Sequence, residues 1–457
     1  MTIGIGVPFL FRSGSGGGPS VNPDFIIEVD TTQAGSASDT IILPLESGGT
    51  YSGTIDWGDS STSALSYANR QHTYAAGGTY TITISGDTFE GWRVANSGDK
   101  LKFIDIQNWG FFTISSSDRQ FDYCENLNVT ATDAPTITTT SFSSIFRNCD
   151  ALTTPDFSNW DTSSVTNMQE AFNGCALFNG NISTWVHSGV TNVYRMLINA
   201  VAFNQDLNTW NTSGVTNWYE MMRNCTAFNG DVSNWSVKGS LNSIFLGCTS
   251  FTGTGLSTWD TSNATSLTGL FSSCTSLTGG YANWNVSNVT SLQSTFNNCD
   301  SITDSFASWD TSAVTSMSQT FQSNNATLVG IENWDTSAVT NMYRTFNGAT
   351  NMNRNIGSWN TSLVTNMGEM LRSAAIDQDL SSWDINQVTN FSGFGIGITL
   401  STANYDALLI AWDAQGAMSY SGTVNFGSSK YTAGGAAEAA RTSLISKWGG
   451  ITDGGAA

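Results

Sequence analysis

The sequence predicts an extended repeat protein: a solenoid of roughly 25-residue units, each holding a short strand and a short helix. A β-sandwich is expected before this array and a small α/β cap after it. Three observations predict this fold: a periodic tryptophan, apolar residues at helical spacing in each unit, and unrelated patterns at both ends. The tryptophans recur every 24 or 25 residues, at Trp160, Trp185, Trp210, Trp235, Trp259, Trp284, Trp309, Trp334, Trp359 and Trp383.

Four segments follow from these patterns. They are a Gly-rich anchoring tail (1–24), a β-sandwich (25–100), a solenoid of about twelve repeats (101–395) and a C-terminal cap (396–457). The tail lacks a basic region before its short apolar run, so it is a poor secretory signal. Gly-rich segments rarely pack on their own domain, and we therefore expect other chains to hold it.

The sandwich is predicted from alternating runs between Gly and Ser turns, such as 41–43 and 80–84. Two motifs stand out there, IDWGDS from Ile55 and HTYAAGGTYTITI from His72. Trp57 is expected in the core of this region, and Asp59 in the turn that follows.

Each unit carries one apolar stripe. In the copy that begins at Trp160, Val165, Met168, Phe172 and Cys175 are spaced as on one face of a short helix. The segment 178–185 alternates more like a strand. One strand and about two helical turns cannot bury a core alone, so the units must stack.

The last segment leaves the repeat. Tyr405, Leu408, Leu409 and Trp412 form one helical stripe behind Ser401 or Thr402 as its N-cap. A second stripe is formed by Ala437, Ala440, Leu444 and Trp448, with a strand at 424–426 between the two. This segment is expected to cover the last rung.

Two resemblances follow from the quoted motifs. The core AFNGCALF from Ala171, between VTNM and ISTW, resembles the bacterial-surface-protein-A-like leucine-rich repeat family over about 109–394. This implies a leucine-rich-type solenoid used in adhesion or surface display. The motifs at Ile55 and His72 resemble the polycystic-kidney-disease-type immunoglobulin-like domain, which implies a spacer or interaction module.

Three columns of the repeat each have two interpretations. The cysteines (Cys124, Cys149, Cys175, Cys225, Cys248, Cys274 and Cys299) share one column with Ala and Asn, which favours buried, reduced thiols over disulfides or zinc. The tryptophans are expected in the core rather than as a sugar platform. The Asp and Asn residues after them are expected to cap turns rather than hold cations.

Composition excludes some functions. There are 36 acidic and 16 basic residues, a net charge of −20, so nucleic acid and anionic membranes are poor partners. No apolar run is long enough to span a membrane. Two histidines and no catalytic motif predict a non-enzymatic protein without cofactor or metal, although a carboxylate pair for glycan hydrolysis stays an alternative.

A ligand is expected where the units differ. The residues after the start of the predicted helix are Tyr and Arg or Glu in three units but small or polar elsewhere, and this combination suits a sugar or protein contact. A plain solvated face is the alternative. The candidate ligand-binding residues are Tyr194, Arg195, Tyr219, Glu220, Tyr343 and Arg344.

These features favour a surface-displayed structural or adhesion protein. We expect a phage virion component, such as a head or tail fibre or decoration protein, that contacts host surface glycans or proteins. A bacterial cell-surface adhesin and a glycan-degrading spike are the alternatives. The expected partners are other structural proteins, through residues 1–24, and the host surface; homo-oligomers are compatible with the pattern.

Overall fold

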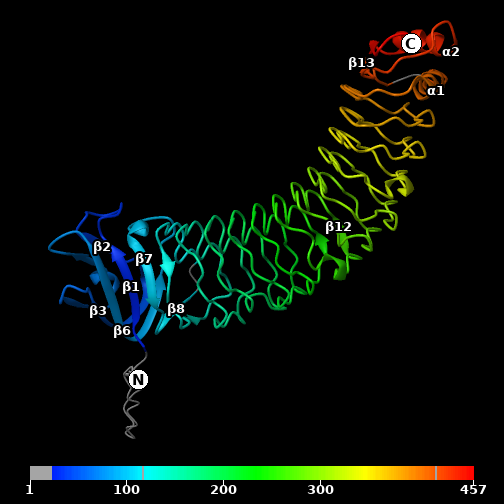
Figure 1. Cartoon of the computed structure of the whole chain (residues 1–457). Coiled ribbons are helices and arrows are strands. Elements are labelled where there is room, and N and C mark those ends of the chain that lie inside the picture. The colour runs from blue at the N-terminus through cyan, green and yellow to red at the C-terminus, as the bar shows by residue number, and fades with distance from the viewer. Residues whose placement is uncertain (1–22, 116–117, 417–418) are drawn as a thin grey trace, which may run out of the picture.

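The computed structural model describes residues 23–115, 118–416 and 419–457. The protein is a long, curved stack of chain turns with a β-sheet at its N-terminal end and two helices at its C-terminal end (Figure 1). Residues 1–22 of the predicted anchoring tail lie outside the described residues.

The N-terminal sheet is built from eight strands in the path order β10-β8-β6-β1-β7-β9, with β3 and β4 joined beside β6. Its core strand β1 lies antiparallel to both β6 and β7, and Ile27 faces Ile82 in the first pair. The bounds are β1 Phe25–Asp30, β3 Leu45–Asp56, β4 Thr62–Ala64, β6 Thr79–Trp92, β7 Phe103–Asn108, β8 Phe112–Ile114, β9 Asn128–Val129 and β10 Thr136–Ile137. A small separate pair is formed by β2 Thr40–Ile42 and β5 Gln71–Thr73.

The predicted immunoglobulin-like β-sandwich is therefore wrong. The sheet does not end near residue 100, because β7 pairs with β1 and then runs parallel to β9 of the next turn. In the same way β8 joins β6 to β10 in parallel. The edges that a sandwich would leave open are extended by the first turns of the stack, so one mixed sheet passes into the repeat.

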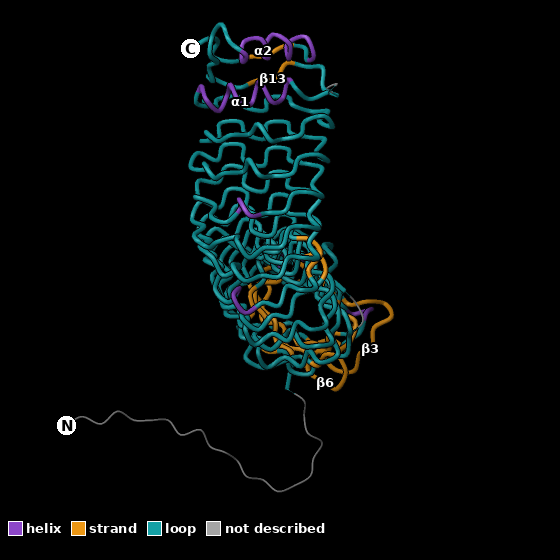
Figure 2. Tube along the Cα trace, turned by 90° about the vertical axis from the view of Figure 1, so that its right-hand side faces the viewer, coloured by secondary structure: helices purple, strands orange, loops and turns teal. Residues whose placement is uncertain are grey.

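The repeat itself is a stack of turns with little regular secondary structure (Figure 2). Adjacent turns meet in isolated parallel bridges at one column, for example Asn167 with Asn192 and Asn192 with Asn217. Longer elements in the stack are β11 Gly239–Ser240, β12 Ala264–Ser266 and the 3-10 helices η3 Leu256–Thr258 and η4 Ile331–Asn333. Two more 3-10 helices, η1 Tyr67–Asn69 and η2 Lys100–Lys102, lie in the N-terminal region.

The predicted leucine-rich-type solenoid of strand-plus-helix units is also wrong, because the repeating units, where the structure describes them, contain no α-helix. Among the described residues there are fourteen strands and only two α-helices, and both helices follow residue 401. Where a helix was expected, alternate backbone N–H groups donate to the next turn: Met168 to the carbonyl of Asn192 and Phe172 to that of Met196. Those N–H groups are then not available for helical hydrogen bonds.

Left-handed residues keep this segment from becoming helical. Glu170 has φ of 54° and Gly174 has φ of 80°, and the same two places are left-handed in unit after unit. A left-handed residue breaks a right-handed helix. The apolar stripe still faces inward, because these kinks turn the chain at about the intervals at which a helix would.

The core is a set of side-chain columns that run along the stack. Phe296 stacks on Phe271 and on Phe321, with ring centroids 5.8 Å apart in each pair. Trp309 and Trp334 are 6.0 Å apart and nearly parallel. Each turn thus buries its apolar side chains against those of its neighbours, as stacked repeats require.

At the C-terminal end, helix α1 Thr402–Asp413 and helix α2 Ala436–Lys447 lie beside the last turns, with the parallel pair β13 Thr423–Asn425 and β14 Gly450–Thr452. Ser401 caps α1 by accepting from the Asn404 N–H. The two stripes expected to be helical are helices whose apolar residues are buried. Trp412 donates its indole N–H to the carbonyl of Leu380, so α1 continues the tryptophan column.

Candidate functional site: the Tyr–Arg strip

The tryptophan column is committed to the core. Trp309 is 3% exposed, and its indole N–H donates to the carbonyl of Tyr281 in the preceding turn at 3.0 Å. The same bond recurs from Trp185 through Trp383. The prediction of core tryptophans is confirmed. Their faces are stacked on one another and cannot hold a sugar.

The Asp and Asn column caps turns, as predicted. Asp310 Oδ1 accepts the Ser312 N–H at 3.1 Å, and Asn360 accepts the Ser362 N–H at 3.0 Å. His187 takes over this role in its own unit, where Nδ1 accepts from the Gly189 N–H. Hydrogen bonding from Ser312 lowers the pKa of Asp310.

All seven cysteines are buried, as predicted, and free. The Cys274 thiol donates to the carbonyl of Phe245 in the preceding turn at 3.0 Å. Asn324, which replaces Cys in this column, makes the same bond through Nδ2 to Phe296 at 3.1 Å. The column therefore requires a small side chain, and Cys and Asn in addition donate to this carbonyl, which Ala200, Ala349 and Ala374 cannot do. Burial raises the pKa of the Cys274 thiol.

A cluster of Asp59, Ser61 and His72 in the N-terminal region has the residue types of a catalytic triad but not its geometry. Asp59 Oδ2 lies 2.8 Å and Ser61 Oγ 3.5 Å from the same nitrogen, Nε2 of His72. A triad needs the acid and the nucleophile on opposite nitrogens of the ring. The hydrogen bond from Ser61, with that from His72, lowers the pKa of Asp59 to about 2.

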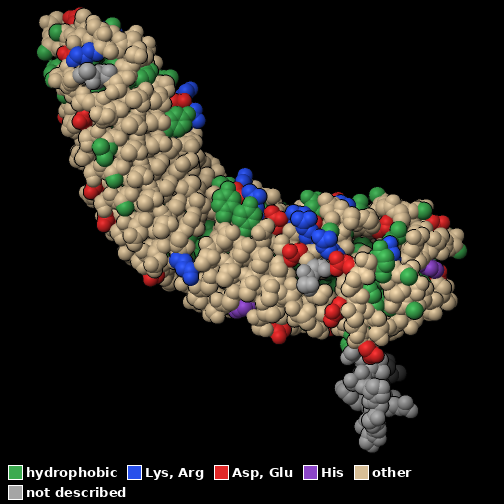
Figure 3. Space-filling view, turned by 180° about the vertical axis from the view of Figure 1, so that it is seen from behind, with side chains coloured by type: hydrophobic (Ala, Val, Ile, Leu, Met, Phe, Trp, Pro, Cys, Tyr) green, Lys and Arg blue, Asp and Glu red, His purple; other side chains and the backbone are tan. Residues whose placement is uncertain are grey.

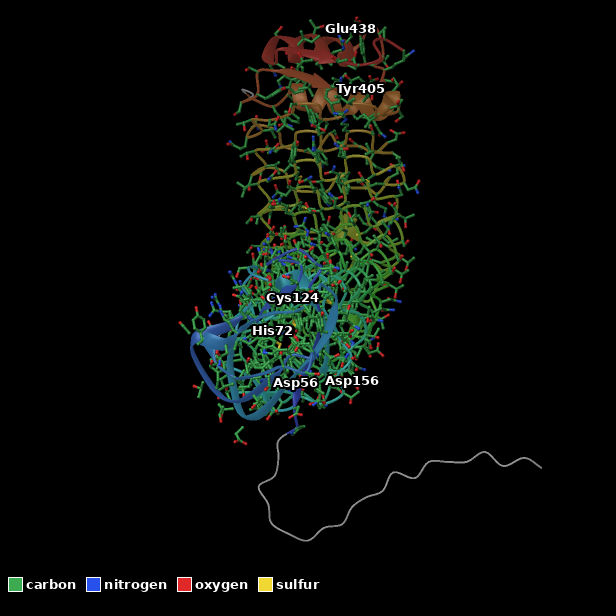
Figure 4. The ribbon with its side chains drawn as sticks, turned by 90° about the vertical axis from the view of Figure 1, so that its left-hand side faces the viewer. Asp56, His72, Cys124, Asp156, Tyr405 and Glu438 are labelled. Carbon is green, nitrogen blue, oxygen red and sulfur yellow. The ribbon has the colours of Figure 1, made fainter. Side chains whose placement is uncertain are left out.

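Tyr74 lies edge-on to His72 at 4.5 Å, but its hydroxyl donates to the carbonyl of Trp57 at 2.9 Å. Figure 4 places His72 and Tyr405 at opposite ends of the molecule. The Ser61–Asp59 contact is itself a turn-capping bond, with Asp59 Oδ1 accepting the Ser61 N–H at 3.0 Å. We assign this cluster to the turn after Trp57, which is fully buried and stacks on His72 at 4.8 Å.

Four of the predicted site residues come together on adjacent turns. The rings of Tyr194 and Tyr219 are stacked 5.7 Å apart, and the guanidinium of Arg195 lies 5.0 Å from the first ring and 5.8 Å from the second. Arg195 Nε donates to Glu220 at 2.7 Å. Tyr219 is 40% exposed whereas Glu220 is 4% exposed, so the acid orients the arginine from below.

The other two predicted residues form a separate cluster six turns further along. The guanidinium of Arg344 lies 4.9 Å from the Tyr343 ring and donates from Nη2 to Glu369 at 2.9 Å. Arg344 and, to a smaller extent, Arg372 keep the pKa of Glu369 below its ordinary value. The two clusters repeat one arrangement: an aromatic ring, an arginine over it, and an acid one turn ahead.

Three members of this arrangement were missed from the sequence: Arg223, Glu369 and Arg372. Arg223 Nη1 donates to Glu220 at 2.6 Å, and Arg372 Nη1 lies 3.4 Å from Glu369. The sequence carries a signal for the two arginines, because Arg223 and Arg372 occupy the same column of the repeat, thirteen residues after the tryptophan of their unit. Comparing charges between adjacent units, rather than within one, would have found them.

We call this surface the Tyr–Arg strip. It consists of the three columns that stand nine, ten and thirteen residues after the tryptophan, from the unit of Trp185 to that of Trp359, with a two-residue shift in the short copy at Trp235. Figure 3 shows Lys and Arg side chains beside hydrophobic ones along the concave edge of the stack, where most other surface is neutral and polar.

The left-handed backbone of this strip does not by itself indicate function. Arg195, Glu220, Arg344 and Glu369 all have φ between 51° and 54°. Ser294 and Gln319, in the same column but without an ion pair, have φ of 55° and 59°. The conformation belongs to the repeat, and only the side chains distinguish the two clusters.

Among the described residues, no group of three or more His, Cys, Asp or Glu side chains is placed to hold a metal ion. Within the same residues, neither α-helix has the length and apolarity that a bilayer span needs.

Comparison with known proteins gives one family. The family described as "Mycoplasma protein of unknown function, DUF285" matches residues 140–242, 239–328 and 315–425. No match was found among curated proteins or among solved structures. The three overlapping segments cover the stack from its second turn through helix α1 and end at β13, before helix α2.

This result corrects both resemblances inferred from the motifs. Neither the bacterial-surface-protein-A-like leucine-rich repeat family nor the polycystic-kidney-disease-type domain matches, so the leucine-rich and immunoglobulin-like descriptions are withdrawn. The matching family carries no function in its description, and it gives no support to the expectation of a virion role. Because the matched segments span well over half of the sequence, the chain belongs to the family of Mycoplasma-type proteins of unknown function, DUF285.

Proposed function

We propose that the protein is a non-enzymatic structural binding protein that holds a glycan or a protein surface through the Tyr–Arg strip. The observation that carries this proposal is the stacked Tyr194–Tyr219 pair with Arg195 over it. Aromatic rings beside arginine are the residues that most often dominate binding energy. Elsewhere in the stack the constant columns are used in packing and turn capping.

The absence of catalysis is part of this proposal. The histidine cluster at His72 lacks the geometry of a relay. Many of the acidic residues in the repeat cap turns, as Asp161 and Asp260 do by accepting from the serine two residues on. A carboxylate used in this way is a poor general acid, because hydrogen bonding from Ser163 and Ser262 lowers the pKa of these two groups.

The test is the double substitution Tyr194→Ser and Tyr219→Ser, assayed against purified cell-envelope polysaccharides and surface proteins. We expect at least a fivefold loss of affinity, since truncating such anchors commonly costs 1 kcal/mol or more. Tyr67→Ser is the matched control, because Tyr67 is also 40% exposed and lies under Arg70 at 3.8 Å.

Undiminished binding by the double variant would exclude the strip. If the unmodified protein binds nothing in the panel, the purely structural role is favoured instead. Thermal unfolding of all three proteins must agree within a few degrees for the comparison to hold.

Surface display stays part of the proposal, on a particle or on a bacterial cell, with residues 1–24 contacting other structural proteins. Antibody-labelled micrographs of particles and of cells distinguish the two locations. Labelling confined to the cell interior would contradict both.

A further inference from the structure

Each cluster of the Tyr–Arg strip holds one more positive than negative charge. In the first, Glu220 lies between Arg195 at 2.7 Å and Arg223 at 2.6 Å. In the second, Glu369 lies between Arg344 at 2.9 Å and Arg372 at 3.4 Å. One carboxylate cannot neutralise two guanidinium groups, so each cluster keeps a surplus charge of one.

In a third ion cluster of the same columns, the positive charge is fully neutralised by carboxylates. Arg147 donates from Nε and Nη2 to Asp122 and from Nη1 to Glu170, at 2.8 to 3.0 Å. All three guanidinium nitrogens are used there, and two carboxylates face one arginine. That cluster holds adjacent turns together, and each nitrogen of its guanidinium already has a carboxylate partner.

The arginines of the strip, in contrast, keep free donors. Within the described part of the chain, Arg195 donates only through Nε and Arg223 only through Nη1. The four arginine side chains are 33%, 39%, 33% and 45% exposed, in chain order. A guanidinium fork with free terminal nitrogens matches a carboxylate in two parallel hydrogen bonds.

The strip between the clusters carries no charge. Apart from Leu246, its residues in the three columns are small or polar, as Ser243, Gly269, Ser294 and Gln319 illustrate. The whole strip thus contains four arginines and two glutamates, a surplus of two positive charges on a chain of net charge −20. An anionic ligand is attracted to this strip and repelled by most of the remaining surface.

The chemical groups that the strip exposes favour a saccharide over a protein as the ligand. Buried centres of protein interfaces are apolar, whereas the strip between the clusters offers hydroxyl and amide groups. The hydroxyls of Tyr194, Tyr219 and Tyr343 have no hydrogen-bond partner among the described residues. Such a row of aromatic edges and hydrogen-bonding groups suits a polyhydroxylated chain.

The two clusters can act on one ligand. They are six turns apart, roughly 29 Å at the spacing of neighbouring strands. A polymer that reaches both binds the second cluster as an intramolecular event, which raises its apparent affinity well above that of either cluster alone.

We infer that the Tyr–Arg strip binds a carboxylate-bearing polysaccharide that bridges the Tyr194 and Tyr343 clusters. This inference rests on the proposed function and adds the class of ligand and the two-point attachment. The sugar rings pack on the tyrosines while the carboxylates accept hydrogen bonds from the arginines.

The test measures binding of the full chain to long polygalacturonate, to short fragments of it, to a carboxyl-reduced neutral form, and to polyglutamate. The key variant neutralises the second cluster without leaving an unpaired charge: Arg344→Gln, Glu369→Gln and Arg372→Gln together. Lys238→Gln is the charge control, since Lys238 lies outside the strip and, within the described ranges, its Nζ donates only to the carbonyl of Ser213.

We expect long polygalacturonate to bind at least tenfold tighter than the neutral form and the short fragments. In the triple variant, the affinity for the long polymer should fall about tenfold. The affinity for the short fragments should fall at most about twofold, because the Tyr194 cluster remains. The control should bind as the unmodified protein does.

Three results would overturn the inference: equal binding of the neutral form, equal or tighter binding of polyglutamate, or an unchanged affinity of the triple variant for the long polymer. Failure to bind polygalacturonate at all would overturn it too. These outcomes differ from failure of the proposed function, which is decided by the tyrosine variants on the wider panel. If the triple variant does not fold, Arg372→Gln alone, at the most exposed arginine, must still weaken binding of the long polymer about threefold or more.

Discussion

At the scale of single residues, a buried carbonyl acceptor one turn away explains which residues occur in the cysteine column. The cysteine column accepts Cys, Ala and Asn because the site needs a small side chain, and its carbonyl partner prefers one that can donate. Phe245 O receives the Cys274 thiol, and Phe296 O receives the Asn324 amide. Sulfur chemistry is not what selects these residues.

The thiols lead to a prediction about alkaline pH. Burial raises the pKa of Cys274 well above its ordinary value of 9.0. The unfolded chain therefore loses these protons from about pH 9 while the folded chain keeps them, so the free energy of unfolding falls as pH rises above 9. Cys274→Ala should cost about 1 to 2 kcal/mol at pH 7 through a small cavity.

The variant should then be less sensitive to pH than the unmodified protein. Between pH 8 and pH 10 it should lose about 1.4 kcal/mol less stability, because one fewer thiol is linked to unfolding. Urea unfolding of both proteins at the two pH values measures this, and the tyrosines cancel in the comparison. Parallel losses would contradict the assignment of Cys274 as a buried thiol.

At the scale of the repeating element, the unit is held by bonds to its neighbours rather than by internal secondary structure. The N–H groups of Glu170 and Phe172 donate forward to the next turn, and the indole N–H of Trp185 donates back to the preceding one. A unit is consequently incomplete on its own, and each one stabilises two others.

The indole bond of this element can be measured with a control from the same column. Trp309→Phe removes the donor to Tyr281 O and leaves that carbonyl buried without it. Trp160 is equally buried, at 3% exposed, but its indole N–H has no partner among the described residues. We expect Trp309→Phe to cost about 1 to 2 kcal/mol more than Trp160→Phe in denaturant unfolding.

Equal losses in the two variants would mean that the tryptophans act through volume alone. Each indole has two indole neighbours: Trp160 stacks on Trp185 at 5.5 Å and meets Trp109 edge-on at 5.3 Å, while Trp309 stacks on Trp334 at 6.0 Å and on Trp284 at 6.5 Å.

At the scale of the whole molecule, the stack behaves as a one-dimensional array whose length sets the distance between the two clusters of the strip. Removing one complete unit, residues 285–309, joins Trp284 to Asp310 in register. We expect the variant to fold cooperatively, since stability is nearly a sum over units and their interfaces, and to be shorter by about 5 Å in solution scattering.

A half-unit deletion is the matched control. Removing 285–296 places each remaining column against the wrong one and should unfold the stack at that point. If the full-unit deletion is as damaging as the half-unit deletion, the turns are not interchangeable and the array description fails. Far-ultraviolet circular dichroism and thermal unfolding distinguish the two results.

The sequence by itself determined the period, the buried columns and the turn-capping residues. These follow from the residue types at each place in the unit: Trp309 and Phe321 are buried, and Asp310 caps a turn. It also placed Tyr194 and Tyr219 on one face, because residues one period apart must align in any stack.

Only the tertiary structure decided the path of the backbone. Apolar spacing within a unit says which side faces inward, but the destination of the N–H groups depends on the neighbouring turn. Gly174 after Asn173 is a turn signal in the sequence, whereas no such residue marks the left-handed Glu170. The same holds for the continuous N-terminal sheet, in which β1 pairs with a strand of the first turn. It holds too for the charge surplus of the strip, because Arg195 and Glu220 are 25 residues apart and meet only when turns are stacked.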